Sequence, residues 1–192
     1  MYGLFVVSAP SGAGKSTLCS RLIQELTPAL RLSISSTSRA PRGNEQHGTH
    51  YFFLSPEEFK LKISQNLFAE WALVHGNYYG TSIETIRQFW AEKSNVLLDI
   101  DVQGAESLKK LFPRQCYTIF ILPPSLEILE HRLRGRGTDR EEVIQKRLEN
   151  AKFEMAQKEK FDLQIMNDDF ELAYAELKRS VLEQMRKWES QE

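Results

Sequence analysis

Residues 4–17 read Leu4-Phe5-Val6-Val7-Ser8-Ala9-Pro10-Ser11-Gly12-Ala13-Gly14-Lys15-Ser16-Thr17. The stretch begins as a short apolar run, which predicts a buried strand, and continues into a turn rich in small residues. Residues 16–26 then predict a helix. A strand, a loop of this composition and a helix in this order form the context that a phosphate-binding loop requires.

The end of this loop matches the P-loop pattern at Gly14, Lys15 and Ser16, whereas the first position holds Ala9 in place of glycine. Small residues let successive backbone N–H groups curl around phosphate oxygens, and the helix N-terminus adds partial positive charge. We expect Lys15 to reach the β- and γ-phosphates of a nucleoside triphosphate and the Ser16 hydroxyl to coordinate Mg²⁺. The residues expected to bind the triphosphate are Ser8, Ala9, Pro10, Ser11, Gly12, Ala13, Gly14, Lys15, Ser16 and Thr17.

The rest of the chain continues the alternation of strands and helices. Apolar runs at residues 95–99 and 116–122, and a weaker one at 161–166, are each followed by a helical pattern. This order predicts an α/β fold with a parallel sheet flanked by helices. The last helix is expected to pack on the core through one face, formed by Phe170, Tyr174, Leu177, Val181, Met185 and Trp188.

Two stretches interrupt this alternation. Residues 36–82 contain a polar loop, a strand-like segment at 51–54 and a predicted turn at 76–80. Residues 126–150 are highly charged and mostly helical. Neither stretch is a repeat or a linker, and 192 residues fit one domain.

Composition is that of a soluble globular protein, with 41% hydrophobic residues, 27% charged residues and a formal net charge of -1. This balance argues against a nucleic-acid partner. No apolar run approaches the roughly 18 residues of a membrane span, and residues 2–8 are too short for a signal sequence. Cys19 and Cys116 lie far apart and predict two reduced, buried thiols. We expect a cytoplasmic protein without a membrane partner, whose oligomeric state the sequence does not indicate.

Several separate stretches together resemble the guanylate kinase family. They are residues 8–17, Ser35-Ser36-Thr37-Ser38-Arg39-Ala40-Pro41-Arg42-Gly43, Phe68-Ala69-Glu70-Trp71, residues 76–81, Leu98-Asp99-Ile100-Asp101-Val102-Gln103-Gly104, residues 132–137 and Asn167-Asp168-Asp169. The family accepts alanine or glycine at the position of Ala9. The combination is much more specific than any one motif and extends nearly from end to end of the chain.

The resemblance implies a P-loop nucleoside monophosphate kinase fold with three parts. The core would comprise about residues 1–35, 83–125 and 151–192, the GMP-binding arm about 36–82, and the lid about 126–150. The arm and the lid coincide with the two interruptions. The implied activity is transfer of the γ-phosphate of ATP to GMP, and to dGMP, with Mg²⁺ as cofactor.

The resemblance also implies which residues hold the acceptor. Guanine presents N1–H and N2–H donors side by side, so the carboxylate of Glu70 can accept both, whereas adenine has no donor at N1. Arg39 and Arg42 suit the phosphate of GMP because guanidinium groups pair with phosphate oxygens. The residues expected around GMP are Ser35, Arg39, Arg42, Tyr51, Glu70, Tyr79, Thr81 and Asp101.

Five residues are expected to be catalytic: Lys15, Asp99, Arg132, Arg136 and Arg147. The three arginines match family arginines that approach the transferring phosphate. Asp99 ends an apolar strand, where it can hold a metal-bound water or orient Lys15, or can instead cap the next helix. Residues 167–169 either cap the last helix or contribute to the adenine pocket.

Three other functions use related scaffolds or motifs. A kinase for ribose 1,5-bisphosphate could use the same scaffold, but Ser35, Glu70 and Thr81 favour an acceptor with a base. A non-catalytic module that binds phosphopeptides would have a degraded phosphate loop, whereas Lys15 and Ser16 are present. A P-loop hydrolase or GTPase is disfavoured because no Asn-Lys-x-Asp motif is visible.

Overall fold

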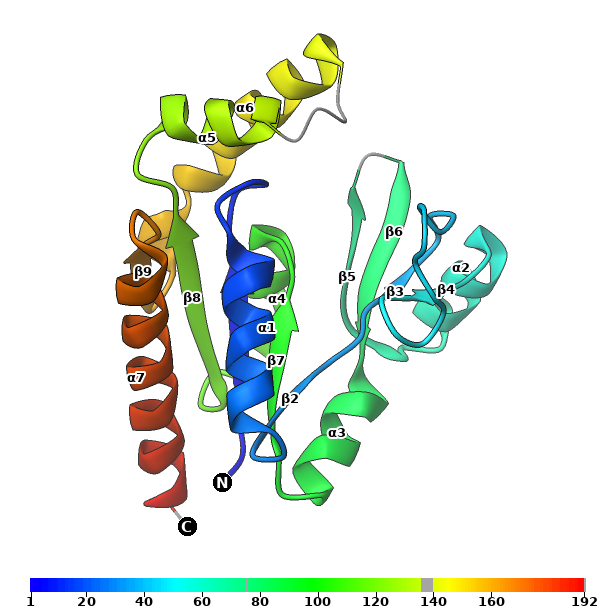
Figure 1. Cartoon of the computed structure of the whole chain (residues 1–192). Helices are drawn as coiled ribbons and strands as arrows, with labels where there is room; N and C mark the ends of the chain where they lie inside the picture. Colours follow the sequence, from blue (N-terminus) through cyan, green and yellow to red (C-terminus); the bar gives the residue numbers. More distant parts are fainter. Residues whose placement is uncertain (75, 136–139, 192) are drawn as a thin grey trace.

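The computed structural model describes residues 1–74, 76–135 and 140–191. Its centre is a parallel five-stranded sheet in the order β2-β7-β1-β8-β9 (Figure 1). The strands are β1 (Leu4–Ser8), β2 (Leu30–Leu32), β7 (Asn95–Asp99), β8 (Cys116–Leu122) and β9 (Leu163–Met166). The predicted fold class is confirmed. The last strand starts two residues later than expected, and β2 was not predicted from the sequence.

Helices cover both faces of this sheet, because the strand residues are apolar on both sides. Phe5 and Val7 of β1 join one buried cluster with α1 (Lys15–Leu26) and α7 (Phe170–Glu189). Leu4 and Val6 join another on the opposite face. That face is covered by α3 (Ile83–Ala91) and α4 (Val102–Leu111).

The predicted core face of α7 is confirmed. Tyr174, Leu177, Val181, Met185 and Trp188 are buried in the cluster shared with α1, and Phe170 packs against it while partly exposed. None of the helices in the described ranges has both the length and the apolar character needed to cross a bilayer. Both cysteines are buried free thiols, as expected, and burial raises the pKa of each to about 12.

A second sheet forms the arm, in the order β4-β3-β6-β5 (Figure 1). It consists of β3 (Ser36–Thr37), β4 (Phe52–Phe53), β5 (Phe68–Val74) and β6 (Asn77–Ser82), and α2 (Pro56–Ser64) packs on it. The arm has an aromatic core of its own. Phe59 is fully buried and stacks on Phe68 and Tyr78, with ring centroids 4.4 and 5.3 Å away.

The predicted turn at residues 76–80 is wrong beyond its first residue. Gly76 has the positive φ of 79° that a turn favours, but Asn77 already pairs with Val74. The pairing continues antiparallel through β6, so that Thr81 lies opposite Glu70. The aromatic side chains of Tyr78 and Tyr79 favour a strand, whereas the glycines at both ends of the segment favour a turn.

Two helices, α5 (Leu126–Gly135) and α6 (Glu141–Met155), lie over the end of the sheet beyond the phosphate loop (Figure 1). They share a small apolar core that includes Leu129, Leu133 and Leu148. Arg136, which the sequence predicts to be catalytic, lies outside the described residues.

Candidate functional site

The phosphate loop joins β1 to α1 through two glycines in left-handed conformations. Gly12 has φ of 100° and Gly14 has φ of 91°, a backbone conformation that residues other than glycine rarely adopt. A Cβ at Gly12 would also lie 3.0 Å from Leu129 Cδ1 and 3.2 Å from Leu133 Cδ2, because α5 rests on the loop. Gly14 precedes α1 and has no side chain to cap it. The first N–H groups of α1 therefore face the loop side and suit an anionic ligand.

Lys15 and Asp99 form a close ion pair at the mouth of this loop. The two residues meet because β1 and β7 are neighbours, with Val7 opposite Asp99. Lys15 Nζ also donates to the carbonyl oxygen of Ile100 at 3.4 Å. Burial alone would lower the pKa of Lys15, but the attraction of Asp99 outweighs burial and raises that pKa. The ion pair fits one of the two roles expected of Asp99, orienting Lys15, which stays a prediction.

The alternative role of Asp99 as a helix cap is wrong. Asp101 caps α4 instead, and its Oδ1 accepts a hydrogen bond of 2.8 Å from the backbone N–H of Gly104. Asp101 is the residue directly before the helix, and from this position a carboxylate can accept a backbone N–H of the first turn. Asp99, two residues earlier, is still in β7.

A cavity of about 430 Å³ lies between the phosphate loop, the carboxyl end of β7 and the arm. Its walls combine residues predicted for the donor with residues predicted for the acceptor. The predicted residues that line it are Ala9, Pro10, Ser11, Gly12, Gly14, Lys15, Ser16, Thr17, Ser35, Tyr51, Glu70, Tyr79, Asp99 and Asp101. The cavity therefore brings together most of the predicted donor residues and most of the predicted acceptor residues, which are far apart in the sequence.

Two residues predicted to bind the triphosphate, Ser8 and Ala13, are buried under the phosphate loop and do not line the cavity. Ser8 is fully buried, and its hydroxyl donates to the carbonyl oxygen of Ile100 at 2.8 Å. Ala13 belongs to the main core, and its N–H donates to the carbonyl oxygen of Pro10 at 3.0 Å. Both residues support the shape of the loop.

Glu70 and Thr81 form a buried hydrogen bond at the inner face of the arm. The hydroxyl of Thr81 donates to Glu70 Oε1 at 2.6 Å, because β5 and β6 place the two residues opposite each other. Glu70 is only 6% exposed. Burial raises the pKa of Glu70 to about 7, and repulsion from Asp101 acts in the same direction. The cavity thus contains a carboxyl group that changes its charge near neutral pH.

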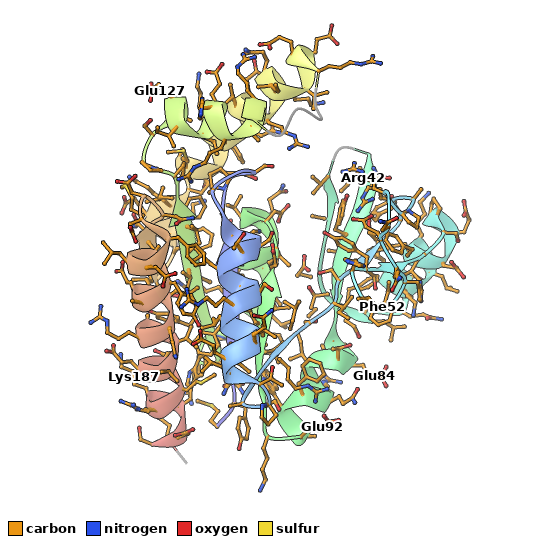
Figure 2. The ribbon with its side chains drawn as sticks, in the orientation of Figure 1. Arg42, Phe52, Glu84, Glu92, Glu127 and Lys187 are labelled. Atoms are coloured by element: carbon orange, nitrogen blue, oxygen red, sulfur yellow. The ribbon has the colours of Figure 1, made fainter. Side chains whose placement is uncertain are left out.

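Arg39 and Arg42 do not line the cavity. Arg39 is buried and makes two hydrogen bonds to the carboxylate of Glu45, of 2.9 and 3.0 Å. The same carboxylate accepts the backbone N–H of Arg42 at 2.7 Å. Figure 2 shows Arg42 at the upper end of the arm. The rings of Tyr51 and Tyr79 lie 6.1 Å apart, and Tyr51 lies beneath the Arg39 guanidinium, 5.4 Å from ring centroid to Arg39 Cζ.

Of the predicted catalytic arginines, Arg147 of α6 reaches the phosphate loop itself, and Arg132 of α5 reaches Asn167, whose side chain contacts that loop. Arg132 donates to the carbonyl oxygen of Asn167 at 3.1 Å, and Arg147 lies 3.4 Å from the hydroxyl of Ser11. Both therefore lie beside the loop that is expected to hold the triphosphate.

Comparison with known proteins agrees with this geometry. The family model for guanylate kinase matches residues 2–184. The chain belongs to the guanylate kinase family. It is 50% identical to the guanylate kinase of Polaromonas sp. over 98% of this chain and 90% of the relative. It is 52% identical to that of Salmonella typhimurium over 91% of this chain and 84% of the relative.

A solved structure is also similar. The crystal structure of guanylate kinase from Anaplasma phagocytophilum matches with a TM-score of 0.79 and 30% identity, covering 95% of this chain and 86% of that chain. The protein is therefore an ATP-dependent nucleoside monophosphate kinase that acts on GMP. The ribose bisphosphate kinase, phosphopeptide-binding and hydrolase alternatives are not favoured.

Sequence reasoning missed one residue of this guanylate kinase site, Glu154, and left open the role of another, Asn167. Glu154 of α6 lines the cavity, and burial raises its pKa to about 7, against the attraction of Lys15. Asn167 is buried, and its side chain contacts the loop at Ala13. A single glutamate in a charged helix carries no recognisable signal. For residues 167–169 the cap interpretation is confirmed at Asp169, whose carboxylate accepts the N–H of Leu172 at 2.9 Å.

Proposed function

We propose that the enzyme holds MgATP on the phosphate loop and GMP on the arm, so that the two nucleotides meet within the one cavity. The observation that supports this arrangement is that Lys15 and Glu70 line the same space. In the reaction, an oxygen of the GMP phosphate forms a bond to the γ-phosphorus, while the bond between that phosphorus and the β–γ bridging oxygen breaks. ADP leaves with that oxygen.

The donor side provides charge and alignment. Lys15 would exchange its partner Asp99 for the β- and γ-phosphate oxygens, and the first N–H groups of α1 would bind the same anion. Phosphoryl transfer needs little covalent help from a protein, so positioning and electrostatic stabilisation are expected to account for most of the rate.

The residues here fit a divalent cation of the Mg²⁺ type. Ser16 and Asp99 line the cavity with a hydroxyl and a carboxylate, which are hard oxygen ligands. Within the described ranges no cluster of three acidic, histidine or cysteine side chains could hold a metal by itself. Mg²⁺ usually takes one or two protein ligands and completes its shell with phosphates and water. It would neutralise charge that develops between the β- and γ-phosphates.

The acceptor side reads the base through Glu70, in its ionised form, accepting from guanine N1–H and N2–H. Thr81 donates to one carboxylate oxygen and would orient it, and Ser35 and Asp101 line the same cavity, where they would lie near the base. Tyr51 and Tyr79 would donate hydroxyl hydrogen bonds to the phosphate, and Arg39 and Arg42 would add positive charge beside it. Because the proposed polar contacts are to the base and the phosphate of GMP, dGMP is expected to be a substrate as well.

Residues 126–150 are proposed to act as a lid over the core and the arm. Arg132 and Arg147 already lie beside the phosphate loop. Closure would direct their guanidinium groups at the transferring phosphate and exclude water, which would otherwise accept the phosphoryl group.

An ADP-release assay tests the proposal. ATP and Mg²⁺ are supplied with GMP, dGMP, AMP, UMP, CMP or ribose 1,5-bisphosphate, and ADP formation is expected with GMP and dGMP only. Lys15→Met is expected to abolish most turnover, whereas Lys110→Met, at an exposed lysine of α4, serves as the matched control and should leave it unchanged. Failure to form ADP with GMP, or ribose 1,5-bisphosphate as the preferred acceptor, would overturn the proposal.

A further inference from the structure

The first turn of α4 packs directly on the carboxylate of Glu70. Gly104 is the third residue of this helix. A Cβ built on Gly104 would lie 2.8 Å from Glu70 Oε2, 3.2 Å from Glu70 Cδ and 3.0 Å from Ile100 Cδ1. A separation of 2.8 Å is shorter than real Cβ contacts, so a side chain at this position would displace the carboxylate.

The backbone of α4 does not require glycine here. Gly104 is absent from the described residues with positive φ and lies within a regular helix, where alanine is more favourable than glycine by about 1 kcal/mol. Its N–H donates to Asp101, and alanine would keep this hydrogen bond. The reason for glycine at this position is therefore the space that Glu70 occupies.

The carboxylate of Glu70 is confined on two sides. Thr81 donates to Oε1 from β6, while the backbone of Gly104 lies against Oε2 from α4. Glu70 is almost fully buried but lines the cavity, so an added methyl group would push Oε2 toward the space proposed for the base. Reading guanine with both oxygens requires the plane of the carboxylate to match the directions of N1–H and N2–H. A small displacement of Oε2 would weaken one of the two hydrogen bonds more than the other.

We propose that Gly104 is a positioning residue for guanine recognition, which keeps both oxygens of Glu70 in the plane of the base. This proposal rests on the proposed role of Glu70 in reading guanine. Gly104 itself contributes no polar group to the base. It acts through Glu70, and its effect is on the KM for the acceptor and on base discrimination.

The test compares Gly104→Ala with the unchanged enzyme on GMP and on IMP, which lacks the 2-amino group. The variant is expected to raise the KM for GMP by about 10- to 100-fold, with a smaller change in kcat and an unchanged KM for ATP. The ratio of kcat/KM for GMP to that for IMP should fall, because one oxygen of Glu70 no longer meets N2–H. Ser107→Ala, at an exposed position one turn further along α4, should change none of these values.

A double-mutant cycle separates this effect from a general loss of structure. Glu70→Asp shortens the side chain by one methylene and removes the overlap, so Gly104→Ala should raise the KM for GMP much less in the Glu70→Asp background. The thermal midpoint of Gly104→Ala should be equal to or above that of the unchanged enzyme, since the helix gains alanine.

The outcomes distinguish this inference from the function on which it rests. If Glu70→Gln loses GMP activity while Gly104→Ala keeps both the KM for GMP and the GMP-to-IMP ratio, the inference is overturned and the proposed function stands. An equal loss with GMP and IMP together with a lower thermal midpoint also overturns it. If Glu70→Gln still distinguishes GMP from AMP, the base is read by another group, and the proposed acceptor site fails first.

Discussion

The side-chain amide of Asn167 donates a hydrogen bond of 2.7 Å to the backbone carbonyl oxygen of Ala13. A Cβ at Gly14 would lie 2.3 Å from the same nitrogen, so Asn167 occupies the space left by that glycine. The main-chain carbonyl oxygen of Asn167 accepts from Arg132. One buried residue at the end of β9 therefore contacts both the phosphate loop and a predicted catalytic arginine.

Asn167→Asp is expected to weaken ATP binding. An ionised aspartate has no donor for the carbonyl oxygen of Ala13 and would place negative charge against it in a buried site. We expect the free energy of unfolding to fall by about 1–3 kcal/mol and the KM for ATP to rise, with little change in the KM for GMP. Steady-state kinetics and thermal unfolding measure both effects. Asn66→Asp, in an exposed turn, is the matched control, and equal effects of the two changes would contradict the prediction.

Glu70→Gln is expected to remove guanine recognition. The amide presents N–H groups where guanine N1–H already donates, so a buried donor is left unpaired. We expect kcat/KM for GMP to fall at least about 100-fold, because a mismatch of polar groups is strongly disfavoured in a buried site. Folding should survive, since the pKa of about 7 means that the carboxyl is already partly neutral near pH 7. Unchanged kinetics with GMP would show that Glu70 does not read the base.

The KM for GMP is expected to fall as pH rises from about 6 to about 8. The pKa of Glu70 is about 7 in the free enzyme, raised by burial and by Asp101, and guanine binds the ionised form. Below that pKa the enzyme must lose one proton on binding, so the KM should change by up to about tenfold per pH unit. The Thr81 hydroxyl faces Glu70, and Glu154 titrates in the same cavity.

The GMP phosphate also contributes to the pH dependence of the KM for GMP, because its second ionisation has a pKa of about 6. Two variants separate its contribution from that of Glu70. The pH dependence assigned to Glu70 should disappear in Glu70→Gln and persist in Glu154→Gln.

The stability of the protein should depend on pH through the same two groups. The carboxyls of Glu70 and Glu154 both have folded-state pKa values above the ordinary 4.5, so their protonated forms favour the folded state. The stability that they contribute is present below about 4.5 and is lost as pH rises through about 7.

Glu45→Gln is expected to destabilise the arm. Arg39 is buried, and its two hydrogen bonds to Glu45 compensate its charge. The hydrogen bonds from Arg39 also lower the pKa of Glu45. We expect a loss of about 1–3 kcal/mol in the free energy of unfolding, whereas Glu92→Gln, which breaks the exposed pair with Arg31, should have a much smaller effect.

The response to GMP sharpens this test. If the acceptor phosphate takes over the pairing of Arg39, saturating GMP should raise the thermal midpoint of Glu45→Gln more than that of the unchanged enzyme. An equal rise of the thermal midpoint in both proteins would indicate that Arg39 does not pair with the phosphate of GMP.

The sequence predicts those parts of the structure that are determined by residues close together in the chain. The phosphate loop and the strands at residues 95–99 and 116–122 could be predicted because neighbouring residues determine them. The bond from Asn167 to Ala13 could not, because it joins positions 154 residues apart. Glu154 shows the same limit, since its burial depends on how α6 packs and not on its neighbours in the chain.

The family resemblance supplied what periodicity could not. Glu70 on its own looks like a surface acid on a strand, and its burial follows from the pairing of β5 with β6 and from the packing of α4. The partner of Arg39 was also unforeseen, because nothing in the loop near residue 45 distinguishes Glu45 from other charged residues of the chain.

Leu129 and Leu133 rest on Gly12, where no side chain separates α5 from the phosphate loop. Any nucleotide that reshapes the loop at Gly12 must therefore push on the apolar core of the helix pair above it. Binding at the donor site would then reach the helix pair by direct packing, at the position of the loop where α5 rests on a glycine.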